Sequence, residues 1–147
     1  MAVKPVPDGY HSVQPYFMVR GAKGLLEFVK KVFNATEVEN MSAPDGTIMH
    51  AELKIGDSII MLADARDPHQ PTTAALSVYV PDVDATYKRA LAAGGTSTME
   101  PANQFYGDRQ GGVKDQFGNV WWISTVVEDV PKEEFMKRAQ EMASKRK

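Results

Sequence analysis

The stretch "GGVKDQFGNVWWIST", residues 111–125, has the pattern of two β-strands joined by a turn at residues 115–119. Glycine is typical of such turns because it adopts a positive φ without steric cost. A second stretch, "TIMHAELKIGDSIIMLA" (residues 47–63), has the same pattern around residues 55–58. Two hairpins of one design in a single chain indicate an internal repeat.

Each hairpin follows a segment that begins as a strand and continues as a helix, residues 15–35 in the first case and 76–95 in the second. Asp82 is a suitable N-cap for the second helix, and Gly94-Gly95 a suitable end. The pattern therefore predicts strand–helix–strand–strand–strand twice, an α+β fold. The apolar residues with helical spacing are Leu25, Phe28, Val29 and Val32, then Val83, Tyr87, Ala90 and Leu91.

We expect one domain at residues 1–130, with modules at about 12–66 and 74–127, and a helical tail at 131–147. Pro131 suits the first turn of the tail helix, where acidic residues come early and basic residues late. The tail helix can dock on its own domain or on a partner subunit, and both alternatives remain open. Its apolar stripe consists of Phe135, Met136, Ala139 and Met142.

Composition excludes several classes of protein. The 147 residues are enough for one domain with a core, and the net charge of −2 argues against a nucleic-acid partner. The chain has no cysteine, and no apolar run suggests a signal peptide or a membrane span. We predict a cytoplasmic protein with neither a nucleic-acid nor a membrane partner.

Alternation along the strands separates two faces of each predicted sheet. Apolar residues such as Phe17, Leu53 and Trp121 should pack on the helices, and Trp122 should be the main apolar contact of a ligand. Gly111-Gly112 should mark a bulge or a close backbone approach. The residues expected to line one cavity on the other face are Gln14, Tyr16, His50, Glu52, Tyr79 and Trp122.

His50 and Glu52 lie two residues apart on one strand, so their side chains project the same way. Three interpretations remain open for them. They can form an exposed polar cluster with Lys54, or line a pocket without catalysis. They can also act as a general acid–base pair or as metal ligands.

The segment before the second hairpin offers further candidates. Tyr106 can rim the cavity mouth. Arg109 can bind a carboxylate or phosphate through its forked donors, or it can pair with Asp108 and brace the loop. His11 and His69 lie in predicted loops and should be surface residues.

Two βαβββ modules with the strings "HAELKIGDS", "QFYGDR" and D-x-F-G-N resemble the vicinal-oxygen-chelate superfamily. This superfamily contains glyoxalase I, fosfomycin- and bleomycin-resistance proteins and extradiol dioxygenases, and the nearest branch is the PhnB-like one. The resemblance covers residues from about 7 to 134. It implies curved mixed sheets from the two modules around a cavity.

The resemblance also implies metal ligands on the first and last strands of each module. A catalytic divalent ion needs about three nitrogen or oxygen donors. We therefore expect no metal and no cofactor there, and an apolar wall that suits an organic ligand instead. The four positions carry Gln14, Met61, Ala75 and Trp122.

We predict a protein that binds a small organic ligand and forms a homodimer, since exposed strand edges need covering. The alternative is a metal-dependent lyase or isomerase, or a dioxygenase-like enzyme, with a shifted site that uses Gln14, His50 and Glu52. The residues predicted to bind the ligand are Gln14, Tyr16, His50, Glu52, Tyr79, Tyr106, Arg109 and Trp122.

Overall fold

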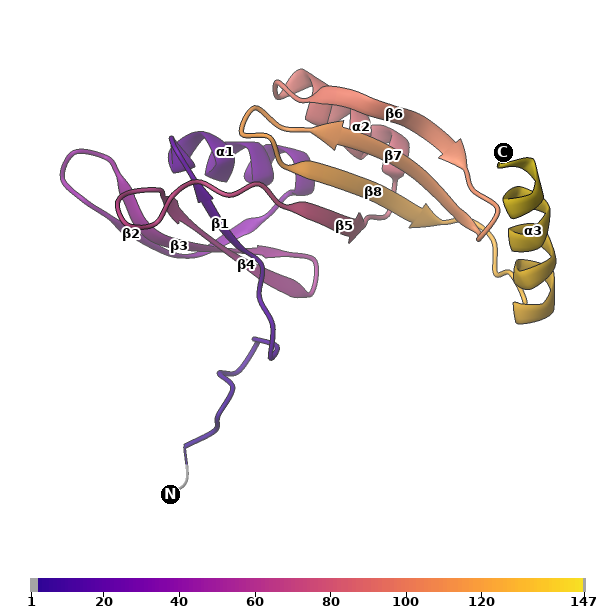
Figure 1. Ribbon diagram of the computed structural model, residues 1–147. Coiled ribbons are helices and arrows are strands. Elements are labelled where there is room, and N and C mark those ends of the chain that lie inside the picture. The colour runs from indigo at the N-terminus through magenta and orange to yellow at the C-terminus, as the bar shows by residue number, and fades with distance from the viewer. Residues whose placement is uncertain (1–2, 147) are drawn as a thin grey trace.

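The computed structural model describes residues 3–146 and contains two βαβββ modules followed by a helix (Figure 1). The first module consists of β1 (Tyr16–Val19), α1 (Ala22–Phe33), β2 (Thr36–Ser42), β3 (Ile48–Ile55) and β4 (Ser58–Asp64). The second consists of β5 (Ala75–Tyr79), α2 (Val83–Ala92), β6 (Thr96–Asn103), β7 (Asp108–Lys114) and β8 (Val120–Val126). The last element is α3 (Lys132–Lys145).

The two sheets have the same topology. Their strand orders are β1-β4-β3-β2 and β5-β8-β7-β6, and in each sheet the first pair is parallel and the others are antiparallel. The predicted fold class, two modules with mixed sheets and a C-terminal helix, is confirmed. The two sheets do not close on each other: they lie side by side in an elongated molecule, with α3 beyond the end of the second sheet (Figure 1).

Helices α1 and α2 contact each other and cover one face of the sheets, as the apolar periodicity predicts. Every predicted apolar position of the two helices is buried except Leu91, which is exposed because it lies on the outer side of α2. Trp121 is 0% exposed and stacks on Phe17 with ring centroids 5.5 Å apart. One core therefore runs beneath both modules, and the prediction that Trp121 faces the helices is confirmed.

The face of each sheet opposite the helices is here called the open face. On β3, Ala51 and Leu53 are fully buried, so the intervening Glu52 points to the open face. On β8, Trp121 and Ile123 are fully buried, and Trp122 points the other way. The strand alternation predicted from the sequence therefore holds at these positions. It fails at the start of β3, where Ile48 is buried and Met49, expected on the helix-facing side, is 42% exposed, because the β2–β3 pairing shifts register between Met41 and Ser42.

The D-x-F-G-N turn between β7 and β8 is held by the buried carboxylate of Asp115. That carboxylate accepts hydrogen bonds from Phe117 N (2.9 Å), Asn119 N (3.0 Å) and Trp121 Nε1 (2.9 Å). Gly118 has φ +90° at the turn. The Gly-rich stretch is therefore a structural hairpin, as its pattern predicts.

Candidate functional site

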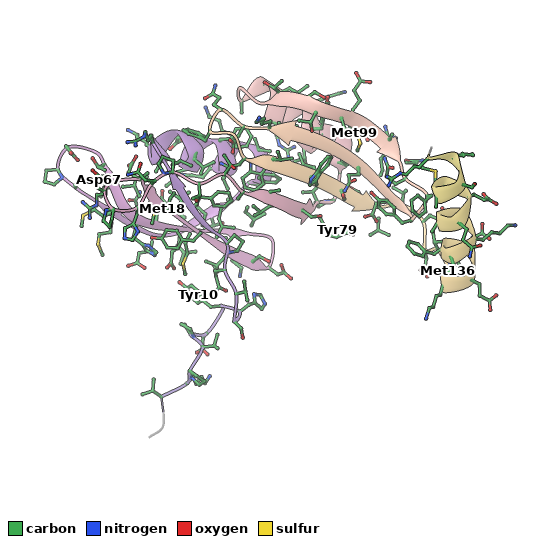
Figure 2. The ribbon with its side chains drawn as sticks, in the orientation of Figure 1. Tyr10, Met18, Asp67, Tyr79, Met99 and Met136 are labelled. Atoms are coloured by element: carbon green, nitrogen blue, oxygen red, sulfur yellow. The ribbon has the colours of Figure 1, made fainter. Side chains whose placement is uncertain are left out.

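The open face of the first sheet carries a continuous chain of polar side chains. Tyr16 Oη lies 2.9 Å from His50 Nδ1, and His50 Nε2 lies 2.8 Å from Glu52 Oε2. Tyr10, in the segment that leads to β1 (Figure 2), donates its hydroxyl to the other oxygen of Glu52. This row of polar side chains extends from β1 across β4 to β3, because the register sets both Tyr16 and Glu52 beside Met61 of β4.

Glu52 is 6% exposed and stays ionised in spite of its burial. Burial by itself raises the pKa of this carboxyl, but the hydrogen bonds from His50 and Tyr10 and the charge of His50 outweigh it and hold the pKa below its usual value. The hydrogen bond to Glu52 raises the pKa of Tyr10, so its phenol keeps its proton. One open interpretation joined His50 and Glu52 to Lys54 in a polar cluster. The hydrogen-bond partners in the structure are instead Tyr16 for His50 and Tyr10 for Glu52.

A further carboxylate joins this group from β2. Ligand atoms of Glu39, His50 and Glu52 all lie within 4.8 Å of one another. The sequence predicted Gln14 as the third member, but Gln14 Oε1 accepts a hydrogen bond from the backbone N–H of His11. The shifted donor group in the structure therefore contains Glu39.

The open face of the second sheet carries tyrosines with neutral or acidic partners. Tyr79 donates a hydrogen bond of 2.8 Å to Asp108 Oδ2, which raises the pKa of Tyr79. Tyr106 donates one of 2.8 Å to Gln110, and burial, followed by the charge of Asp108, raises the pKa of Tyr106. None of these four residues is a histidine, so they form no pair like that of His50 and Glu52.

Trp122 completes the second open face. Its ring lies against Gly112, where a Cβ would come within 2.8 Å of the indole. Gly111 approaches Tyr87 of α2 on the opposite face. The predicted close approach therefore occurs at these glycines. The β6–β7 pairing shifts register around Met99, and the extra residues lie on β6 opposite the glycines, so the bulge is on the neighbouring strand.

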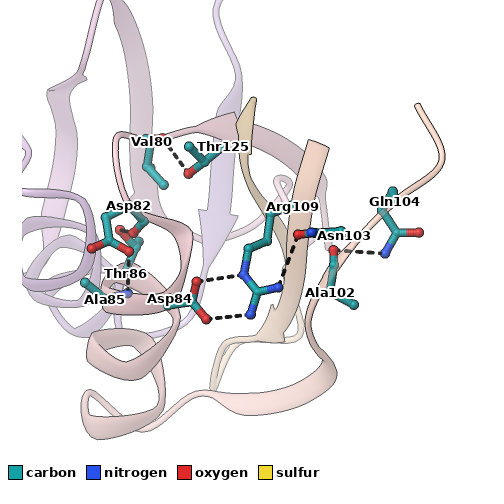
Figure 3. Close-up of polar contacts among 10 residues, drawn as sticks. All are labelled: Val80, Asp82, Asp84, Ala85, Thr86, Ala102, Asn103, Gln104, Arg109 and Thr125. Carbon is teal, nitrogen blue, oxygen red and sulfur yellow. Dashed lines mark hydrogen bonds and ion pairs between the residues drawn. The ribbon is translucent and has the colours of Figure 1, made fainter. Parts of the chain in front are cut away.

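Arg109 does not join the predicted ligand-binding group. Its guanidinium donates to both carboxylate oxygens of Asp84 on α2 (2.8 and 3.0 Å) and to Asn103 (3.2 Å), as Figure 3 shows. Pairing with Arg109 lowers the pKa of Asp84. The predicted alternative, a pair between Arg109 and Asp108, is also wrong, because neighbouring residues of a strand point to opposite faces.

A groove of about 570 Å³ lies between the modules. Its walls come from the segment before β1, the β3–β4 hairpin and β5. Tyr79 is the predicted ligand-binding residue that lines it, and it lies at the end of β5 in Figure 2. The other lining residues are His11, Val13, Pro15, residues 55–60, Leu76, Ser77 and Val78.

The superfamily metal positions do not fit a divalent ion. Tyr16 and Ser77 are equivalent positions, because each precedes the first residue of the following helix by six. Tyr16 pairs with Met61 and Ser77 pairs with Trp122, so Met61 and Trp122 are equivalent positions of the two modules as well. A thioether and an indole offer no hard donor, and Ala75 offers none at all. These positions therefore have too few donors to hold a catalytic divalent ion.

The chain belongs to the Glyoxalase/Bleomycin resistance protein/Dioxygenase superfamily, whose model matches residues 12–123. It is 33% identical over 134 residues to an uncharacterized protein of Mycobacterium bovis, covering 84% of this chain and 88% of that one. An uncharacterized protein of Mycobacterium tuberculosis is 33% identical over 134 residues and covers 84% of this chain and 79% of that one. The superfamily predicted from the sequence motifs is confirmed.

Solved structures share the fold. TioX from Micromonospora sp. ML1 has a TM-score of 0.64 at 24% identity, covering 79% of this chain and 100% of that chain. A PhnB protein from Bacillus cereus has a TM-score of 0.58 at 17% identity, covering 78% and 99%. The fosfomycin resistance protein FosX from Mesorhizobium loti has a TM-score of 0.56 at 18% identity, covering 78% and 91%.

Sequence reasoning missed Tyr10 and Glu39. Tyr10 precedes β1 in a segment without periodicity, so no pattern could bring it to Glu52. Glu39 meets Glu52 through a register shift between Glu37 and Glu39 in the β2–β3 pairing. A regular strand would place Val38 opposite Glu52, and a bulge is not visible in alternation alone.

Helix α3 contacts its own chain. Arg138 donates to Glu128 (2.9 and 3.0 Å) and to the carbonyl of Phe105 (3.0 Å), and Phe135 packs on the Phe105 ring. These contacts support the alternative in which the helix docks on its own domain. The hydrogen bond from Arg138 also lowers the pKa of Glu128. Within residues 3–146, no helix is long and apolar enough to cross a membrane.

Proposed function

We propose that this protein binds a small organic molecule in the groove between its two modules. The observation that carries the proposal is the lining of that groove. Apolar side chains such as Val13 and Val78 form its walls, and His11, Ser77 and Tyr79 supply polar groups. A volume of about 570 Å³ lies in the range of small-molecule sites.

Two further observations support a small organic ligand. Ser77 pairs with Trp122 across the β5–β8 register, so an indole lies beside the groove residue Ser77. Relatives of this fold are named for resistance to bleomycin and fosfomycin, which are small molecules. A binding role needs no metal at the superfamily positions, which agrees with Met61 and Ala75 there.

A substitution that fills the groove tests the proposal without breaking a polar contact. Ligands are first found by a thermal-shift screen of small molecules, and their affinities are measured by calorimetry and tryptophan fluorescence. Ser77→Phe should weaken binding of a hit at least tenfold, whereas Thr36→Phe, on the exposed face of β2, should leave it unchanged. A library in which every hit binds Ser77→Phe as tightly as the unchanged protein contradicts the proposal.

We also propose a homodimer in which a second copy covers part of the open faces. Every residue of β2 is exposed, and β2 is the edge strand of its sheet, beside β3. Tyr16 and Tyr79 are exposed at 43% and 63%, which leaves aromatic surface that association can bury. Sedimentation at micromolar concentration should show a dimer, and a monomer throughout the concentration series would contradict it.

A further inference from the structure

The open face of the first sheet has a group of three metal-ligating side chains that includes none of the superfamily positions, although Glu52 lies beside Met61. We propose that Glu39, His50 and Glu52 form a binding site for one divalent transition-metal ion, with zinc preferred. The ligand groove does not include these residues. The inference therefore goes beyond ligand binding in that groove and does not depend on it.

The distances fit a shared ion. Two ligands of a tetrahedral zinc ion, each about 2.1 Å from it, lie about 3.4 Å apart. His50 Nε2 and Glu52 Oε2 are 2.8 Å apart across their hydrogen bond, so they need to separate by only about 0.6 Å when an ion takes the place of that proton. The ligand atom of Glu39 lies within 4.8 Å of both, and because Glu39 is exposed, a change of rotamer brings it into the first coordination shell.

The partners of the ligands are also in place. A metal-binding histidine usually donates its second ring N–H to an oxygen, which sets its tautomer. His50 Nδ1 lies 2.9 Å from Tyr16 Oη, so a metal at Nε2 leaves Nδ1–H to bond with Tyr16. Tyr10 donates to the second oxygen of Glu52 and holds that carboxylate in position.

The backbone brings two like charges together at this point. The β2–β3 register sets Glu39 opposite Glu52, an arrangement that is unfavourable for two carboxylates unless a cation lies between them. The register shift after Glu37 is what produces the arrangement, since it replaces Val38 by Glu39 at this position. One imidazole and two carboxylates suit zinc, with a remaining coordination position directed to the open face.

The test uses the full chain without a histidine tag, freed of metal with a chelator and titrated with zinc against a chromophoric competitor. One zinc per chain should bind, with a Kd of about micromolar or tighter. Glu39→Gln and His50→Gln should each weaken binding at least tenfold. Tyr16→Phe, which keeps every ligand, should weaken it about tenfold.

Matched controls separate a built site from general attraction to acidic surface. Glu37→Gln removes the same charge from the same strand, and His69→Gln removes a histidine from a loop, and both should bind zinc as the unchanged protein does. X-ray absorption of the zinc form should show one imidazole nitrogen among oxygen ligands. Thermal unfolding without metal establishes that each variant folds; Glu39 is exposed, so Glu39→Gln keeps the test decisive if His50→Gln unfolds.

The proposal is overturned if no saturable zinc binding is found, or if Glu39→Gln binds zinc as tightly as Glu37→Gln. Ser77→Phe should keep full zinc affinity while it loses the organic ligand. Glu39→Gln should lose zinc binding and keep its affinity for the organic ligand, and Ser77→Phe should do the opposite. These two results together distinguish the metal site from the groove.

Discussion

The two modules share topology but stabilise their corresponding parts differently. Helix α2 has a local N-cap, because the Asp82 side chain accepts from Ala85 N at 3.1 Å. Helix α1 begins after Gly21, and the N–H groups of Gly21 and Ala22 donate to Asp64 at the end of β4, at 2.9 and 3.0 Å. The same fold is thus reached by a contact within one turn in one module and across the module in the other.

The open faces differ more than the helix-facing ones. The first carries His50 and Glu52, and the second carries Tyr79, Tyr106 and Trp122. Core packing constrains only the residues that face the helices, so the open face can change its chemistry while the fold is kept. A repeat of this kind can therefore hold two different sites.

The largest difference in stability should be between variants of the two adjacent tryptophans. Trp121→Ala should lower the free energy of unfolding by about 3–5 kcal/mol, because it empties space beneath both modules. Trp122→Ala removes a half-buried ring from the open face and should cost clearly less. Urea unfolding of both variants measures this, and a larger loss for Trp122→Ala would mean that the faces are assigned in reverse.

The hairpins of the two modules should differ nearly as much. Asp115→Ala leaves Trp121 Nε1 and the buried Asn119 without their acceptor and should cost about 3 kcal/mol. Asp57→Ala, at the exposed turn of the other hairpin, should stay within about 0.5 kcal/mol. Equal thermal stabilities of the two variants would contradict the prediction that the two hairpins are stabilised differently.

The helix caps give a smaller contrast. Asp64→Ala should cost about 2–3 kcal/mol, because Gly21, Ala22 and Ile48 all donate a backbone N–H to this carboxylate. Asp82→Ala should cost about 1 kcal/mol, the usual cost of losing an N-cap. Chemical denaturation of the pair is the measurement, and a greater loss at Asp82 would show that the local cap is the stronger.

The smallest effect concerns Tyr79 and depends on pH. Tyr79→Phe should cost about 1–2 kcal/mol at neutral pH, because the buried Asp108 loses its donor. The folded pKa of Tyr79 lies above its unfolded value, so this stability is complete below about pH 10 and is lost as pH rises through the folded pKa. Tyr79→Phe should therefore lose less stability above pH 10 than the unchanged protein, and parallel alkaline unfolding curves would contradict this.

Part of the candidate site could be predicted from alternation, and part could not. His50 and Glu52 are two residues apart on β3, so a period of two was enough to place both on the open face. Their partners Tyr10 and Glu39 come from a segment without periodicity and from a bulged strand. Arg109 was predicted to face a ligand because its forked donors were known, but its partner Asp84 lies on a helix 25 residues away.

The sequence by itself determined the repeat, the helix-facing side of β1, β8 and most of β3, and the local cap at Asp82. Each of these depends on residues within a few positions of one another, whose spacing follows from 3.6 residues per helical turn and two per strand repeat. Only the tertiary structure decided which polar groups meet: Asp64 with the start of α1, Arg109 with Asp84, and Glu39 with Glu52. Such contacts join residues far apart in the chain, and they depend on strand order, bulges and helix position, which no local spacing encodes.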